Sequence, residues 1–324
     1  MRWQRGTSDE NIEDRRGSTG GGFRGLPGGG GLRLGLGGLI IIGILSLAFK
    51  QNFFALLGDL PADTTMSTSA PTGAPVSASP EEKERYEFVK FVVNDVQDTW
   101  TTVLPQEANV PYQISKLVLF RDAVRSACGF AEAASGPFYC PGDQKVYIDL
   151  SFYDELRARF GAAGDFAQAY VIAHEFGHHL QNILGIDRQM RRAQQQRPDQ
   201  GNALSVRLEL QADCFAGVWG HSTNARRILE SGDVESGLNA AAAIGDDRIQ
   251  RMSGRGVHPE KFTHGSSAQR VEWFRRGLES GSLGACDTFG NEKRGQAPFP
   301  AGVRSAGPSR GAGGGGKSRR AGAE

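Results

Sequence analysis

The stretch "AHEFGHHLQN", residues 173–182, contains three of the six histidines in the chain. His174 and His178 are four positions apart, so on a helix they lie on one face and can bind the same cation. Glu175 follows the first histidine, which completes the His-Glu-x-x-His pattern of two zinc ligands and a carboxylate that accepts a proton from zinc-bound water. Two surface histidines on a helix could show this spacing by chance. The flanking residues are apolar, however, and buried histidines need polar partners, so we favour a metal site.

The residues around this motif predict a helix over 163–185, with an apolar stripe at helical spacing. Asp165 can cap its start, and Gly185 can end it. His179 is adjacent to His178 and points about a quarter-turn away on an α-helix, so it is a poor ligand for the same ion. The longer metzincin pattern requires Gly and His at the positions where this chain has Gln181 and Leu184, so that class is excluded.

A catalytic zinc site needs a third protein ligand and an open fourth position. The segment "RLELQADCFAG", residues 207–217, supplies Glu209 and Asp213, which lie one turn apart on a second apolar-flanked helix. We predict that Glu209 is the third ligand and that Asp213 orients a ligand histidine through its free ring N–H. An exposed acidic pair is the alternative, but the apolar neighbours disfavour it. Asp246 and Asp247 are weaker rivals because charged Arg248 follows them.

Composition divides the chain of 324 residues into segments. Its formal net charge of +1 argues against nucleic acid as a partner, because phosphate binding needs a basic surface. Many of the 45 glycines lie near the two ends. We predict a disordered, cytoplasmic Gly/Arg-rich segment (1–33), a transmembrane anchor (34–57), a flexible linker (58–80), one folded metallopeptidase domain (81–291) and a disordered Gly-rich tail (292–324).

The anchor prediction rests on the uncharged apolar run over residues 34–49. A signal peptide or a core helix fits less well, because thirty polar residues precede the run and it has no polar face. Six arginines before the run favour a cytoplasmic N-terminus, which puts the domain outside the cytoplasm. Four cysteines in an oxidising compartment predict two disulfides. Cys128 and Cys140 flank a short loop, so Cys214 and Cys286 pair by exclusion; four buried free thiols are the alternative.

The remaining periodicities predict a helix-dominated α+β domain with a small sheet. Alternating or β-branched runs predict strands at 116–120 and 145–150. Apolar residues at spacings of three and four predict further helices at 81–104, 203–222, 233–252 and 266–281.

The segments "HEFGHHLQN" and "ELQADCFAG", with "PFYCPGDQKVYIDLSFYDEL" and "FTHGSSAQRVEWFRRG", resemble the bacterial YpfJ-like neutral zinc metallopeptidase family. The resemblance implies a zincin-like domain that binds one zinc ion through His174, His178 and Glu209, with Glu175 as the base. It also implies one N-terminal transmembrane helix in the bacterial inner membrane, with the domain in the periplasm. The likeness of the Glu-x-x-x-Asp element to other membrane zinc proteases implies that His264 steadies the transition state.

These residues predict hydrolysis of peptides or unfolded proteins by a zinc-activated water with Glu175 as general base. His264, or less readily His221 or His258, would stabilise the oxyanion. The strand within residues 145–153 would be the sheet edge that pairs with an extended substrate. Two alternatives remain: a zinc-binding periplasmic chaperone that does not cut its client, and a structural zinc site, which would usually have four protein ligands.

Overall fold

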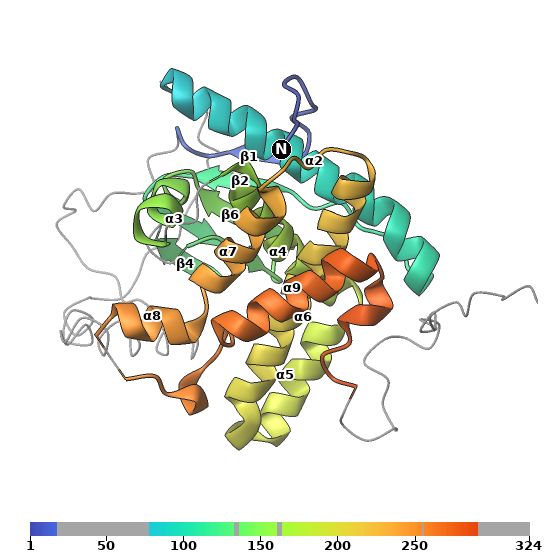
Figure 1. The fold of residues 1–324 in the computed structure, drawn as a ribbon, viewed down its shortest axis with the longest axis vertical. Helices are drawn as coiled ribbons and strands as arrows, with labels where there is room; N and C mark the ends of the chain where they lie inside the picture. The colour runs from blue at the N-terminus through green and yellow to red at the C-terminus, as the bar shows by residue number, and fades with distance from the viewer. Residues whose placement is uncertain (18–77, 133–135, 161–163, 255, 291–324) are drawn as a thin grey trace, which may run out of the picture.

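The computed structural model describes residues 1–17, 78–132, 136–160, 164–254 and 256–290, which form a helix-dominated α+β fold (Figure 1). The expected anchor, the Gly-rich tail and nearly all of the expected linker lie outside these residues. Within the described ranges, no helix is long and apolar enough to cross a membrane. In Figure 1 the sheet lies beneath the long helix α2, α6 and α9 cross the middle of the view, and α5 lies at the end opposite α2.

The main sheet has four strands in the order β1-β2-β6-β5. The first three are parallel, and β5 pairs antiparallel with β6 at one edge. A separate antiparallel hairpin is formed by β3 and β4. The two predicted strands are confirmed as β2 and β6. The strand bounds are β1 Ile12–Asp14, β2 Leu117–Phe120, β3 Ala123–Ser126, β4 Gly129–Glu132, β5 Phe138–Cys140 and β6 Lys145–Asp149.

The helices follow the apolar periodicity closely where that periodicity is long. The predicted helices correspond to α2 (Pro80–Ala108), α4 (Asp165–Ile183), α6 (Gly201–Ala225) and α9 (Ser267–Ser280). Ser266 caps α9 in a capping box with Gln269. Asp165 makes no capping hydrogen bond at α4, which begins after Gly164. Two helices were not predicted, α3 (Phe152–Phe160) and α5 (Ile186–Gln196). The short 3₁₀ helices η3 (Pro198–Gln200) and η4 (Pro259–Lys261) lie between longer helices, and η5 (Leu283–Cys286) follows α9.

The prediction of one continuous helix over 233–252 is wrong. The structure has two helices there, α7 (Asp233–Ala243) and α8 (Asp246–Met252). Gly245 has an extended backbone at the break. A Cβ atom at this position would lie 2.3 Å from the backbone nitrogen of Ser267, so the break allows the chain to pass against the start of α9.

Close backbone contact between α6 and α9 is the main packing feature behind the site. A Cβ atom on Gly217 would lie 2.1 Å from the carbonyl oxygen of Phe274, and one on Gly277 would lie 1.9 Å from that of Cys214. No side chain fits at either position. The two glycines therefore let α9 lie directly on α6, which brings α9 side chains within reach of the ligand-bearing helices.

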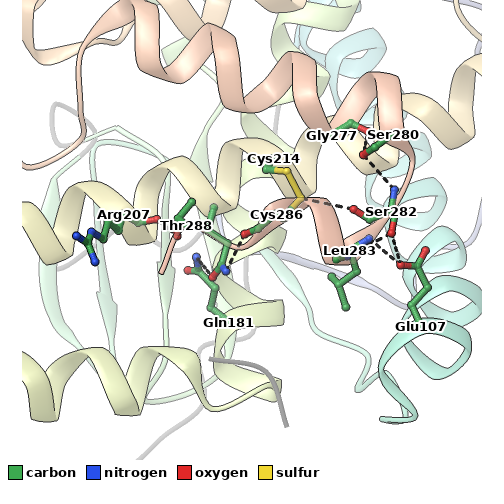
Figure 2. The surroundings of a disulfide bond; sticks show 12 residues. Glu107, Gln181, Arg207, Cys214, Gly277, Ser280, Ser282, Leu283, Cys286 and Thr288 are labelled. Atoms are coloured by element: carbon green, nitrogen blue, oxygen red, sulfur yellow. Dashed lines mark hydrogen bonds between the residues drawn. A yellow bond between two sulfur atoms is a disulfide. The ribbon is translucent and has the colours of Figure 1, made fainter. Parts of the chain in front are cut away.

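Both predicted disulfides are confirmed, and together they use all four cysteines of the chain. Cys128, in the turn between β3 and β4, is bonded to Cys140 on strand β5. Cys214 on α6 is bonded to Cys286 at the end of η5, as Figure 2 shows. One bridge thus holds the sheet edge, and the other holds the C-terminal part of the domain to α6.

The prediction that residues 1–33 are disordered is wrong for residues 1–17. Strand β1 pairs in parallel with β2, although more than a hundred residues separate them. The indole of Trp3 packs edge-on against Phe88 and donates a hydrogen bond of 3.1 Å to Asp165 at the start of α4. These long-range contacts make the N-terminal segment part of the domain, a pairing that local composition does not reveal.

This packing conflicts with the predicted topology of a cytoplasmic N-terminus and an external domain. Strands that share a sheet lie on the same side of a membrane, whereas one crossing between residues 17 and 78 would separate them. We expect cysteines introduced at exposed Glu10 and Glu279 to react equally with an impermeant thiol reagent in right-side-out vesicles. The native cysteines do not react with the thiol reagent because all four are in disulfides. Labelling of Glu279→Cys alone would instead support a single crossing with β1 outside the sheet.

Candidate metal centre

Helices α4 and α6 bring the three predicted ligands together. The Nε2 atom of His174 lies 3.2 Å from Oε2 of Glu209, and Nε2 of His178 lies 3.5 Å from Oε1 of Glu209. All three residues offer ligand atoms within 4.8 Å of one another. A tetrahedral zinc ion with bonds of 2.0–2.1 Å separates its ligand atoms by roughly 3.3 Å. The donor set and its spacing therefore fit one zinc ion.

Glu175 lies beside these ligands and lines the same cavity, whose volume is about 570 Å³. Its side chain is largely buried. It is outside the group of residues that could share the ion. The cavity therefore leaves room for a water and a substrate next to a carboxylate outside the ligand group of the described residues, and the general-base role of Glu175 stays a prediction.

A network of buried polar side chains holds the ring of His174. Its Nδ1 atom lies 2.8 Å from Oδ1 of Asp213, which is the orienting role predicted for that residue. The hydroxyl of Tyr170 donates to the same oxygen at 2.5 Å. Arg270, on α9, donates to both carboxylate oxygens of Asp213 at 2.8 and 2.9 Å. The ring of His174 is thus fixed with Nε2 toward Glu209.

The sequence analysis missed Arg270, Tyr170 and Gln181 as members of the site. Arg270 lies nearly a hundred residues after His174, and only the close packing of α6 and α9 brings it to Asp213. Tyr170 lies on α4, one turn before His174, among the buried residues of that helix. Its position at i−4 was the one available sign that its hydroxyl could reach the site.

The buried charges of this group compensate one another. Burial opposes ionisation of Glu209, but His178 and His174 hold the pKa of its carboxyl well below the usual range. Burial likewise disfavours the charge on His174, yet Asp213 and Glu209 raise its pKa to about 9. Burial disfavours the charge on Asp213 too, but Arg270 and His174 lower its pKa. Both carboxylates are therefore anionic at neutral pH and suited to a cation.

The structure shows which of the other four histidines line the cavity and which lie elsewhere. His264 is half-exposed and lines the same cavity as the ligands. His221 is near the end of α6 and bonds to the carbonyl of Leu278, and exposed His258 pairs with Glu260. Neither belongs to the ligand cluster in the described part of the chain. His179 is buried, and its two ring nitrogens bond to the hydroxyl of Tyr139 and the carbonyl of Gln113 rather than facing the ligand group.

Asp246 has a role that the sequence analysis did not assign. Its Oδ2 atom accepts backbone hydrogen bonds of 2.7, 2.7 and 3.0 Å from Thr263, His264 and Gly265. Its Oδ1 atom lies 3.3 Å from Nδ1 of His264. The hydrogen bond to Asp246 raises the pKa of His264, although burial partly opposes this. Asp246 is thus no rival ligand; it fixes the loop that presents His264 to the cavity.

The predicted edge strand is wrong. Strand β6 lies inside the sheet between β2 and β5, and β5 forms the edge. Residues of β5 and the preceding turn line the cavity: Gly136, Pro137, Phe138 and Tyr139. The hydrophobic run of β6 reflects burial on both sides, whereas the shorter β5 lines the cavity next to the metal centre.

Removal of the Asp213 carboxylate should weaken zinc binding and destabilise the fold together. We expect Asp213→Ala to lower zinc affinity by about 10- to 100-fold, because His174 loses its orienting partner. Arg270, 2% exposed, would become an unpaired buried charge, at about 3–5 kcal/mol. Zinc titration and thermal melting measure the two effects. Asp95→Ala, which breaks a pair with Arg226, is the control and should lower stability alone.

Two imidazoles and one carboxylate around one point, beside an open cavity, define a mononuclear centre of the kind that catalytic zinc proteins use. The family described as "Putative neutral zinc metallopeptidase" matches residues 1–289, and the chain belongs to this family. The match begins at residue 1, so it includes the N-terminal segment that packs on the domain.

Two relatives show how far the similarity extends. "Uncharacterized protein YpfJ" of Escherichia coli strain K12 is 47% identical over 295 residues, which cover 90% of this chain and 99% of that protein. "Uncharacterized protein Rv2575" of Mycobacterium tuberculosis strain H37Rv is 43% identical over 208 residues, which cover 60% of this chain and 68% of that protein. No solved structure matches the chain.

Proposed function

We propose that this protein is a zinc-dependent endopeptidase that hydrolyses extended peptide segments. The observation that carries the proposal is the position of Glu175: it lines the cavity next to three zinc-compatible ligands without belonging to them. Family membership supports a zinc metallopeptidase. A purely structural zinc would have a closed set of four protein ligands, and the described residues bring only three together.

Different side chains of the protein carry out the separate steps of the proposed reaction. Zinc in such a ligand set lowers the pKa of water to about 7 and polarises a carbonyl group. Glu175 accepts the proton of the attacking water and delivers it to the leaving amine. His264, presented by Asp246, donates to the oxygen of the tetrahedral intermediate. Asp213 and Arg270 hold His174 throughout.

Strand β5 offers the binding surface for the substrate backbone. It is an edge strand beside the metal centre, so an extended peptide can pair with it by strand addition. Apolar side chains line the same cavity and suit bulky apolar residues of an unfolded chain: Phe138, Phe152, Val171, Ile244 and Ile249. Folded proteins rarely expose such segments, so we propose unfolded polypeptides as the substrate class.

The direct test uses the full-length chain, because residues 1–17 are part of the domain. The purified protein is incubated with reduced, unfolded casein, with and without a zinc chelator. We expect new amino termini that appear only when zinc is present and return when zinc is restored. Casein that stays bound and intact under both conditions would overturn the peptidase proposal in favour of a chaperone.

His264→Ala should separate oxyanion stabilisation from metal binding. We expect kcat to fall by about 10²–10³-fold, as for loss of one oxyanion donor, with zinc affinity unchanged. His258→Ala is the matched control, because His258 is exposed and its side chain pairs with Glu260 in the described part of the chain. Equal kcat values for the wild type and His264→Ala would assign the role to another group.

We place the peptidase outside the cytoplasm. Two disulfides that use every cysteine of the chain support this assignment, since such bonds persist in oxidising compartments. The vesicle-labelling experiment above tests it for both the N-terminal segment and the domain. Labelling of both introduced cysteines only in inverted vesicles would place the domain in the cytoplasm instead.

A further inference from the structure

Two fully buried glutamines connect the second ligand histidine to a disulfide. Gln181 and Gln211 are both 0% exposed. The Oε1 atom of Gln181 lies 2.9 Å from Nδ1 of His178. Its amide nitrogen donates to the carbonyl of Leu208 at 2.7 Å and to Oε1 of Gln211 at 3.2 Å. The amide nitrogen of Gln211 donates to the carbonyl of Cys286 at 3.0 Å (Figure 2).

The direction of every hydrogen bond in this chain follows from its last member. A backbone carbonyl can only accept, so Gln211 must present its NH₂ group to Cys286 and its oxygen to Gln181. Gln181 then donates to that oxygen and to Leu208, which leaves its own oxygen toward His178. An amide oxygen can only accept. His178 must therefore carry its proton on Nδ1, and its Nε2 lone pair points toward Glu209.

The far end of the chain is firmly held. Cys286 is bonded to Cys214, which follows the histidine-orienting Asp213 directly on α6. The 3₁₀ helix that ends at Cys286 is held at its start by Glu107, whose carboxylate accepts hydrogen bonds of 2.8 Å from Ser282 and Leu283. The carbonyl of Cys286 is therefore a fixed point relative to α6 (Figure 2).

We propose that Gln181 and Gln211 are positioning residues of the metal centre: they set the tautomer and ring orientation of His178, and the Cys214–Cys286 disulfide anchors them. This inference rests on the proposed zinc site. It also explains why the two histidines have different partners. Glu175, Glu209 and Asp213 already place three carboxyl groups around the site, and a neutral amide orients the second histidine without a fourth buried charge.

The experiment compares zinc affinities of full-length variants by competition with a chromophoric chelator. Gln181→Leu keeps the size of the side chain but removes the acceptor, and we expect about 10- to 100-fold weaker zinc binding. Gln181→Glu restores an acceptor for Nδ1–H, but it also adds a buried charge and loses the donor to Leu208 and Gln211, so it should recover only part of the affinity that Gln181→Leu loses. Gln211→Leu should show a smaller loss, because Leu208 still holds Gln181. The absorption spectrum of the cobalt-substituted protein should change in Gln181→Leu and shift back toward that of the wild type in Gln181→Glu.

Gln97→Leu is the matched control. Gln97 is equally buried and accepts hydrogen bonds from Ser115 and Tyr112, away from the ligands. Its loss should lower the melting temperature without altering zinc affinity. Wild-type affinity in both Gln181→Leu and Gln211→Leu would overturn the positioning role alone. A wild-type chain that binds no zinc would overturn the metal centre and the proposed function with it, and if Gln181→Leu does not fold, Gln211→Leu decides the question.

Discussion

Glu175→Gln is expected to reduce peptide hydrolysis by about 10²–10⁴-fold, the usual contribution of a positioned general base. Glutamine has nearly the same shape as glutamate, but its amide oxygen is too weak a base to accept the proton of the attacking water. Zinc content should remain at the wild-type level, because Glu175 lies beside the three ligands rather than among them. Substrate binding along β5 should also persist, so KM should change little.

The measurement pairs initial cleavage rates with zinc per chain for the same preparations. Glu272→Gln is the matched control, because Glu272 is exposed on α9 and its partner within the described ranges is Arg276. It should cut at the wild-type rate. Full activity in Glu175→Gln would remove this residue from the mechanism, and loss of zinc together with activity would show that it is a ligand.

Glu209→Ala is expected to lose tightly bound zinc, and with it all zinc-dependent activity. The carboxylate lies 3.2 and 3.5 Å from the Nε2 atoms of the two ligand histidines, so its removal leaves an incomplete, two-imidazole site. Zinc at one hundred times its Kd stabilises a folded chain by about 2.7 kcal/mol. A domain of this size melts about 2–4 °C lower for each kcal/mol lost. We therefore expect a fall of about 5–10 °C in zinc-containing buffer.

Dialysis against a mild chelator, followed by metal analysis and melting curves with and without added zinc, measures both effects. Glu260→Ala is the control, because Glu260 is exposed and, among the described residues, pairs with His258 away from the ligands. Added zinc should raise the melting temperature of the control and the wild type but not that of Glu209→Ala. One zinc per chain retained in Glu209→Ala would point to another ligand, with His264, which lines the same cavity, the first to be examined.

The spacing of residues within single helices was enough to predict the ligands at the centre of the site. His174, Glu175 and His178 lie within five residues of one helix, and Glu209 and Asp213 are one turn apart on another. An apolar stripe fixes which face of each helix is buried, so the polar residues on that face must meet in the interior. The sequence therefore determined the two ligand-bearing helices, the three ligands that the structure brings together, and the number and pairing of the disulfides.

Contacts between residues far apart in the sequence determine the other features of the fold and the site. The approach of α9 to α6, which depends on Gly217 and Gly277, brings Arg270 to Asp213. The strand order makes β5 the edge beside the cavity, and residues 1–17 join the sheet. The glutamine chain to Cys286 exists only because η5 returns to α6. Each of these contacts joins residues far apart in the sequence, and helical or strand periodicity reports only which face is buried, never which partner covers it.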